Sequence, residues 1–153
     1  GLTKLVKSSG KYKVMDRDEA GSTEEMREIQ RQALLCDTFL MSTNAMTDDG
    51  VLVNIDGLGN RLAALCYGPK QVIVVAGINK VTHSEEAAME RARNVAAPIN
   101  IHRFAANVTP CKKTGKCGNC ISDGCICRQI LVTRMSMIPE RIKVVLINEN
   151  LGF

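Results

Sequence analysis

The segment QVIVVAG, residues 71–77, limits most narrowly what this chain can fold into. It is a continuous aliphatic and β-branched run that ends at glycine, without the alternating polar residues of a half-exposed strand. Such a run is typical of a strand buried on both faces of a parallel sheet. We therefore expect an α/β fold with a mainly parallel sheet and helices on both of its faces.

The segments around this run predict the alternating helices and strands that such a sheet requires. Ser22 and Glu25 form a capping box that predicts a helix over 22–36, and Ser84 predicts the start of a helix over 82–97. The expected strands are 11–16, 37–42, 51–55, 129–137 and 142–149, the last two forming a β-hairpin that closes the sheet. The expected connections are a polar loop with an Asp-Gly turn at 43–50 and a glycine-rich loop that leads into a short helix at 56–68.

Length and composition favour one globular domain over residues 1–153, without linkers or repeats. Hydrophobic residues make up 45% of the chain and charged residues 24%, so extensive disorder is not expected. The net charge of +4 is spread along the chain and aromatic residues are only 3%, which argues against a nucleic-acid-binding surface. The sequence contains no apolar run of membrane-spanning length and no signal peptide, so we predict no membrane association and a cytoplasmic location.

Five of the seven cysteines lie in one short segment, CKKTGKCGNCISDGCIC, residues 111–127. In a cytoplasmic protein, clustered cysteines more often bind metal than form disulfides, and thiolates in a glycine-containing loop can converge tetrahedrally. The predicted metal ligands are Cys111, Cys117, Cys120 and Cys127, with Cys125 as a substitute. We expect Zn2+ in a structural site; an iron–sulfur cluster is the alternative, and disulfides formed in air remain open. Lys112, Lys113 and Lys116 would partly offset the negative charge of the thiolates.

A second group of polar residues lies in loops at predicted strand ends, where α/β folds place binding groups. Glycines in DGLGNR would let the backbone approach a ligand, and a following helix N-terminus favours an anion. The predicted ligand-binding residues are Asn44, Asn54, Asp56, Gly57, Gly59, Asn60, Arg61, Asn79 and Lys80. Ordinary turns use the same residue types, so the spacing alone leaves both interpretations open. No catalytic set can be assigned from the sequence.

Several stretches, taken in order, resemble the LUD domain of the lactate-utilisation family. These stretches are STNAMTDDGVLVNIDGLGNRLAALCYGPKQVIVVAGINKV, RNVAAPINIHRF, TPCKKTGKCGNCISDGCIC and VVLINENLGF. The resemblance covers nearly the whole chain and implies the fold shared by sugar-phosphate isomerases, glucosamine-phosphate deaminases and CoA transferases. It also implies that an N-terminal portion found in family members is missing before residue 1.

The resemblance further implies a role accessory to the oxidation of lactate or a related organic acid, with iron–sulfur proteins as partners. It points to a cysteine-bearing standalone subgroup, whose last cysteine corresponds to Cys127 and in which Cys125 is a departure. We expect a small anionic ligand, with Arg61 and Lys80 supplying positive charge, and a separate four-cysteine metal site; a homodimer is one assembly open to the chain. The alternatives are an enzyme of the sugar-phosphate isomerase or CoA-transferase type, and a redox or interaction module that docks an iron–sulfur partner.

Overall fold

Strand β4 (Gln71–Gly77) is the middle strand of a three-stranded parallel sheet in the computed structural model, which describes residues 1–153. It lies between β1 (Thr38–Met41) and β7 (Ile142–Ile147), and both neighbours run parallel to it. Val72 and Val74 are fully buried. The prediction of a parallel strand from the continuous apolar run is therefore confirmed, but only one face is fully buried, since Ile73 and Val75 on the other face are half-buried.

A second, four-stranded sheet has the order β5-β2-β3-β6. Its strands are β2 (Ala45–Thr47), β3 (Leu52–Asp56), β5 (Val81–Thr82) and β6 (Gln129–Thr133). β2 pairs with β5 in parallel, whereas β3 pairs with both β2 and β6 in antiparallel fashion. The fold is thus α/β as predicted, but its strands are divided between a parallel and a mixed sheet.

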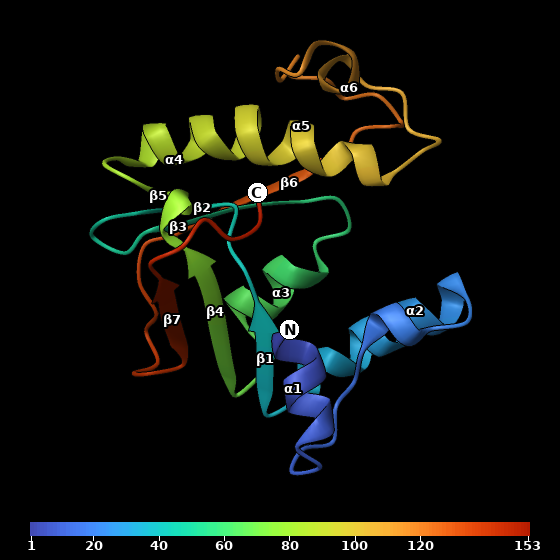
Figure 1. Ribbon diagram of the computed structural model, residues 1–153, viewed down its shortest axis with the longest axis vertical. Coiled ribbons are helices and arrows are strands. Elements are labelled where there is room, and N and C mark those ends of the chain that lie inside the picture. The colour runs from blue at the N-terminus through green and yellow to red at the C-terminus, as the bar shows by residue number, and fades with distance from the viewer.

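A long helical run lies across the mixed sheet (Figure 1). It consists of α4 (Glu85–Arg91), a π-helical stretch (Ala92–Ala96), α5 (Ala97–Asn100) and a final 3-10 turn (Ile101–Arg103). Ser84 caps its start by accepting a hydrogen bond from the backbone of Ala87, as its sequence position predicts. Pro98 does not end the run, because it stands in the first turn of α5, where a missing N–H costs least.

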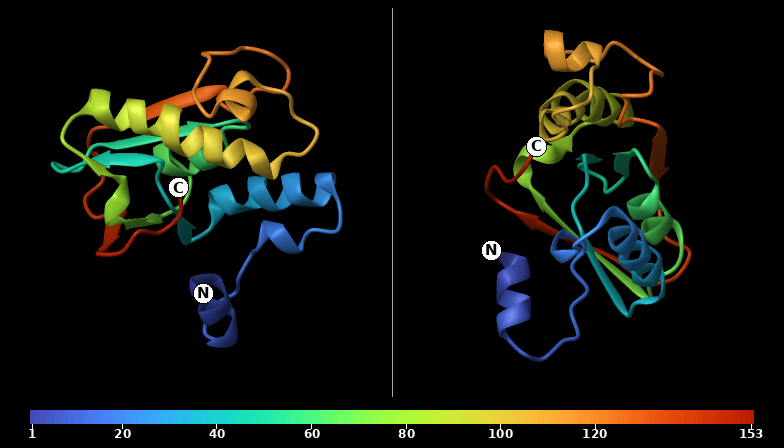
Figure 2. Two further views of the ribbon diagram at one scale, coloured as in Figure 1. Left: turned by 45° about the horizontal axis from the view of Figure 1, so that its top comes forward. Right: turned by 90° about the vertical axis from the view of Figure 1, so that its right-hand side faces the viewer.

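The other helices lie around the parallel sheet or at the periphery (Figures 1 and 2). They are α1 (Leu2–Ser8), α2 (Thr23–Gln32), α3 (Asn60–Cys66) and α6 (Pro110–Thr114), with 3-10 turns at Arg17–Glu19, Ala33–Leu35 and Ile78–Lys80. The Ser22 hydroxyl accepts a hydrogen bond from Glu25 N and starts α2, as the capping box predicts. No helix has both the length and the apolar character needed to cross a bilayer.

Two apolar clusters on opposite faces of β3 hold these layers together. Val53 and Ile55 point toward α4, where Ala88 and Ala92 allow the helix to approach the sheet closely. Leu52 points the other way, into a cluster with Leu65 of α3 and buried residues of the parallel sheet. β3 therefore joins the two halves of the core.

Two local predictions are wrong. Residues 11–16 form no strand, since Asp16 instead caps a 3-10 turn by accepting from Asp18 N. The segment 43–50, expected as a polar loop, contains strand β2, whose residues pair with β3 and β5. The Asp-Gly turn within it is present, with Gly50 at a φ of 100°.

The predicted C-terminal hairpin is also wrong, because β6 and β7 belong to different sheets. Arg141, which is 6% exposed, explains why the chain crosses over. Its guanidinium donates to the carbonyls of Ala64, Leu65 and Pro69 at the C-terminal end of α3. Its own carbonyl accepts from Val72 N at 2.7 Å, which starts β7 beside β4.

Candidate functional site

The carboxyl ends of β1 and β4 bring Lys80 against the loop that follows β1. Lys80 is only 4% exposed. Its Nζ donates to Ser42 Oγ at 3.0 Å and to the Thr43 carbonyl at 3.1 Å. Both acceptors are uncharged, so no carboxylate of the chain neutralises this buried ammonium group.

Arg91, at the end of α4, binds the residue before Lys80 and the residue after Thr43. Its Nε donates to the Asn79 carbonyl at 2.8 Å and its Nη1 to the Asn44 carbonyl at 2.5 Å. Sequence reasoning missed this residue, although it stands between Ala88 and Ala92 on the helix face that packs on the sheet. Its Nη2 donates no hydrogen bond within the protein and is available to a ligand.

Arg61 joins the same network through the end of β3. Its Nη2 donates to the Ile55 carbonyl at 2.7 Å, and Ile55 N donates to Asn44 Oδ1 at 2.9 Å. Unlike Lys80 and Arg91, Arg61 has an acidic partner, Asp56, whose Oδ2 lies 3.4 Å from Nε. The predicted Asn44, Asp56, Arg61, Asn79 and Lys80 are thus brought together, with Arg91 as an additional member.

Asp56 also takes the role that the sequence analysis assigned to an external anion at the start of α3. Its Oδ1 accepts from Gly57 N at 2.8 Å, and its Oδ2 accepts from Arg61 N at 3.2 Å. These backbone donors therefore have a partner within the chain, and ligand binding at this helix start stays a prediction. The positive charge left over lies at Lys80 and Arg91 instead.

The surplus of positive charge is visible in the titration of Lys80. Burial, and then the nearby charges of Arg91 and Arg61, lower the pKa of Lys80 to about 8. Burial is also the main cause that lowers the pKa of Arg61 and of Arg91. Of these three partly or fully buried cationic groups only Arg61 is paired with a carboxylate, so a bound anion would stabilise the other two.

Asn54, another predicted ligand residue, is 0% exposed and has no hydrogen-bond partner for either Oδ1 or Nδ2. Alternation along β3 turns its side chain to the same side as Leu52, away from α4. Buried amides are rarely left without partners, because an unpaired polar group costs free energy. The unused amide is consistent with a bound ligand or water that supplies the missing partners.

Gly59 and Asn60 take no part in the hydrogen bonds around Lys80 and Arg91. They line a shallow groove of about 280 Å³ on the α2 side of α3, together with Arg27, Arg31 and other residues. Gly59 has a φ of 85°, a left-handed conformation that favours glycine, and it starts α3. The structure therefore divides the predicted ligand residues between two places.

The C-terminal segment covers Lys80. Asn79 holds it in place by donating from Nδ2 to the Gly152 carbonyl at 3.3 Å and by accepting from Leu151 N at 3.1 Å. A Cβ added to Gly152 would stand 3.3 Å from Lys80 Nζ. A ligand that reaches Lys80 must therefore approach beside, or displace, this segment.

The five clustered cysteines lie close to one another in space. Burial, and then the neighbouring Cys125, Cys117, Cys111 and Cys120, together raise the pKa of the Cys127 thiol to about 12. No three Cys, His, Asp or Glu side chains are arranged for direct metal coordination in the structure. The four predicted ligands and Cys125 are thus neighbours, and metal binding by them stays a prediction.

The cysteine segment is contiguous with the glycine loop, whereas a separate site was expected. Arg128 N donates to the Asp56 carbonyl at 3.0 Å. A Cβ added to Gly57 would lie 3.4 Å from the Ile126 carbonyl oxygen. On its other side, Cys117 N donates to Asn94 Oδ1 at 2.9 Å, which anchors the segment to the π-helical stretch.

A comparison with family models identifies the chain from its sequence as a whole: the LUD domain matches residues 3–147. The chain belongs to the LUD-domain family. This membership confirms the resemblance and relates the protein to lactate utilisation. Searches of curated proteins and of solved structures gave no match.

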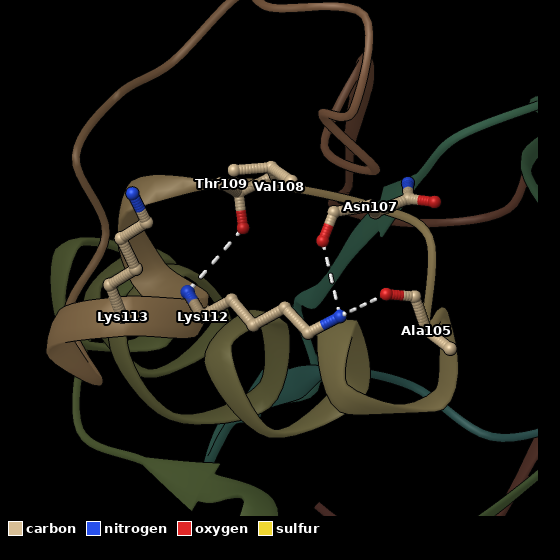
Figure 3. A pocket seen from close by; sticks show the side chains of 6 residues that line it. All are labelled: Ala105, Asn107, Val108, Thr109, Lys112 and Lys113. Atoms are coloured by element: carbon tan, nitrogen blue, oxygen red, sulfur yellow. Dashed lines mark hydrogen bonds between the residues drawn. The ribbon is translucent and has the colours of Figure 1, made fainter.

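In this LUD-domain chain, a small pocket of about 190 Å³ adjoins the cysteine segment (Figure 3). Lys112 crosses it, and its Nζ donates to the carbonyls of Phe104, Ala105 and Asn107 at 2.7, 2.9 and 3.1 Å. This ammonium group is therefore used to hold the loop that precedes α6. Of the pocket's two lysines, only Lys113 forms no such bond with the chain.

Proposed function

We propose that this LUD-domain protein binds a small carboxylate, such as lactate or pyruvate, as an accessory to the oxidation of lactate or a related organic acid. The observation that carries the proposal is the buried Lys80 ammonium beside Arg91, neither of which is paired with a carboxylate, whereas Asp56 balances Arg61. A small anion would balance the remaining charge. The buried setting strengthens such an interaction relative to one in water.

Each group of the cluster has a role that follows from its chemistry. Arg91 offers Nη2 and Lys80 offers a buried amine, so together they would hold a carboxylate by charge-assisted hydrogen bonds. The unused amide of Asn54 would hydrogen-bond to the polar end of the ligand. Arg61 would mainly hold the end of β3 in place rather than bind the ligand, since Asp56 already balances most of its charge.

The test is a thermal-shift screen of the full chain with lactate, pyruvate, sugar phosphates and CoA thioesters. A ligand of this site raises the Tm of the wild type but not that of Arg91→Gln. Arg93→Gln is the matched control, because Arg93 lies two residues along the same helix and bonds Asn119 instead. An equal Tm increase in wild type and Arg91→Gln contradicts the proposed site.

The same screen separates the carboxylate proposal from its enzymatic alternatives. A response to sugar phosphates or CoA thioesters, without one to lactate or pyruvate, favours a sugar-phosphate isomerase or CoA-transferase activity. Both alternatives rest on fold similarity alone. The surplus cations and the absence of a second acidic group beside Lys80 are the reasons for preferring a simple carboxylate.

We propose further that the cysteine segment binds a metal, because four other thiols lie around Cys127. Soft thiolate donors suit Zn2+ or an iron–sulfur cluster, and the positive charge of a bound metal would offset the repulsion between the deprotonated thiolates. Cys111, Cys117, Cys120 and Cys127 would be the ligands, with Cys125 as substitute. An iron–sulfur site would also suit docking to an iron–sulfur partner.

Metal analysis of anaerobically prepared protein, with a visible absorption spectrum, tests this part. Colourless protein with one zinc supports a structural site, whereas a brown protein that contains iron supports the redox alternative. Cys127→Ser abolishes binding in either case, while Cys125→Ser retains most of it. Protein without bound metal that also fails to take up Zn2+ or to be reconstituted with iron and sulfide contradicts the metal proposal.

A further inference from the structure

We propose that Lys80 forms an imine with the carbonyl group of its ligand, so that the site selects 2-oxo carboxylates over 2-hydroxy carboxylates. This inference rests on the carboxylate site proposed above and adds a covalent step to it. The chemical class follows from the two groups that converge there. An arginine recognises the carboxylate, and a primary amine reacts with the adjacent carbonyl.

The surroundings of Lys80 suit a nucleophilic amine. Nζ contacts the neutral Ser42 hydroxyl and Thr43 carbonyl, and Lys80 forms no ion pair with a carboxylate. Arg91 binds Asn44 and Asn79, the residues next to Thr43 and Lys80, so its positive charge lies beside the amine. A lysine that is desolvated and next to another cation keeps a larger neutral fraction, and the lowered pKa of Lys80 agrees with this.

The step needs no oxidant or further reactant. The neutral amine of Lys80 adds to the carbonyl carbon, forming a C–N bond, and the carbonyl oxygen takes up a proton. This carbinolamine then loses its hydroxyl group as water and the nitrogen loses a proton, which leaves a C=N bond. The Ser42 hydroxyl, 3.0 Å from Nζ, is positioned to carry a proton between the nitrogen and the departing oxygen.

Access to the amine is controlled by the C-terminal segment. Gly152 covers Nζ, and two hydrogen bonds to the Asn79 side chain, both at exposed positions, hold the segment there. Exposed hydrogen bonds of this kind contribute little, so the segment can lift without disturbing the sheet. The covered amine would thus meet ligands only as this segment opens.

Reductive trapping tests the inference on the full chain. The protein is incubated with pyruvate and sodium cyanoborohydride, digested, and mapped by mass spectrometry. We expect a stable adduct on Lys80 whose mass equals that of pyruvate minus water plus two hydrogens, and none with lactate. Lys70 is the matched control, since it is exposed and its pairing with Asp37 raises its pKa. Its adduct should be weaker by roughly 100-fold or more, because a pKa above 10.5 leaves far less of its amine neutral than a pKa of about 8.

The outcomes separate this inference from the proposed function. If lactate and pyruvate both raise the Tm but no adduct forms on Lys80, the carboxylate site stands and the imine is wrong. If neither acid raises the Tm and Lys80 is not trapped, both proposals fail. Equal trapping at Lys70 and Lys80 also overturns the imine. Lys80→Arg, whose fold is checked by circular dichroism, should keep the charge but lose both the adduct and the preference for pyruvate.

Discussion

At the scale of single residues, the hydrogen-bond acceptors around Lys80 and Arg91 decide the properties of the site. The two side chains bind three backbone carbonyls and one hydroxyl, which do not cancel their charge, and Arg91 Nη2 is left without a partner. Arg61 differs because Asp56 balances it. The net positive charge of the site therefore comes from Lys80 and Arg91, and the substitutions that test it follow from this difference.

Replacing Asn54 by leucine should stabilise the ligand-free protein. Leucine has the same branching but no polar atoms, so it removes an amide that is buried without partners. We expect a gain of about 1 kcal/mol in the free energy of unfolding, measured by urea denaturation, together with a weaker ligand response. A clear loss of stability would show that the amide has partners in the ligand-free protein, or that the site has no room for leucine.

The pH dependence of stability should report the buried Lys80 amine. Its pKa is about 8 in the folded protein against an ordinary value of 10.5, so between these values the unfolded chain binds more protons and stability rises with pH. Lys80→Met lacks this titration. The stability of Lys80→Met relative to the wild type should be highest below pH 8, where the wild type bears the full cost of the buried charge. This difference should shrink by about 3 kcal/mol as the pH rises to 10.5. A pH-independent difference in the urea unfolding free energies of the two proteins would contradict the burial of a titrating amine.

At the scale of elements, the helical run from α4 to α5 connects the two candidate sites. Arg91, in its last α-helical turn, reaches the ligand cluster. Arg93 and Asn94, in the π-helical stretch, bind Asn119 and Cys117 of the cysteine segment. π-helical stretches often mark functional positions in helices. Here the ligand cluster is contacted just before the stretch and the cysteine segment is contacted from within it.

Asn94→Ala should loosen the cysteine segment without unfolding the sheet. It removes the acceptor of the 2.9 Å hydrogen bond from Cys117 N. We expect the stability of the segment to fall by about 1 kcal/mol. Hydrogen exchange should become faster over residues 111–127 and stay unchanged in β4. Equal protection of the segment in both proteins would show that other contacts hold it in place. Asn100→Ala, on the same helical run but away from Cys117, is the control.

Gly77→Ala should release the C-terminal segment. A Cβ at this position would lie 2.5 Å from the backbone Glu149 O and Leu151 N, so the segment must move aside. We expect faster hydrogen exchange over residues 149–153 and faster acylation of Lys80 by an amine-reactive reagent. Gly115→Ala, which has open space around the added Cβ but carries its own strain from a φ of 73°, is the comparison variant. Unchanged exchange at the C-terminus of Gly77→Ala would contradict the packing described here.

At the scale of the whole molecule, local signals predicted the elements but not their partners. The apolar run of β4 and the caps at Ser22 and Ser84 carry their information within a few residues, and each was placed correctly. β6 and β7 lie in different sheets, and Arg141, just before β7, hydrogen-bonds to α3. This contact spans more than seventy residues of sequence, and no local pattern encodes it.

In the candidate site, too, local sequence signals predicted some residues but not their long-range contacts. Asn44, Asn79 and Lys80 were predictable because strand ends in α/β folds gather polar residues at one edge. Arg91 was not, since an arginine in a charged helix resembles a solvated one until the neighbouring alanines are seen against the sheet. The contiguity of the cysteine segment with the glycine loop likewise arises from the pairing of β3 with β6, which is formed over a long sequence separation.

The most direct test of the proposed site is a crystal structure of the full chain with bound pyruvate. We expect the carboxylate within hydrogen-bonding distance of Arg91 Nη2, with the carbonyl carbon beside Lys80 Nζ. Pyruvate in the groove between α2 and α3, beside Arg27 and Arg31, would contradict it. Those arginines already pair with Glu24 and Glu28, so the account expects that groove to be empty.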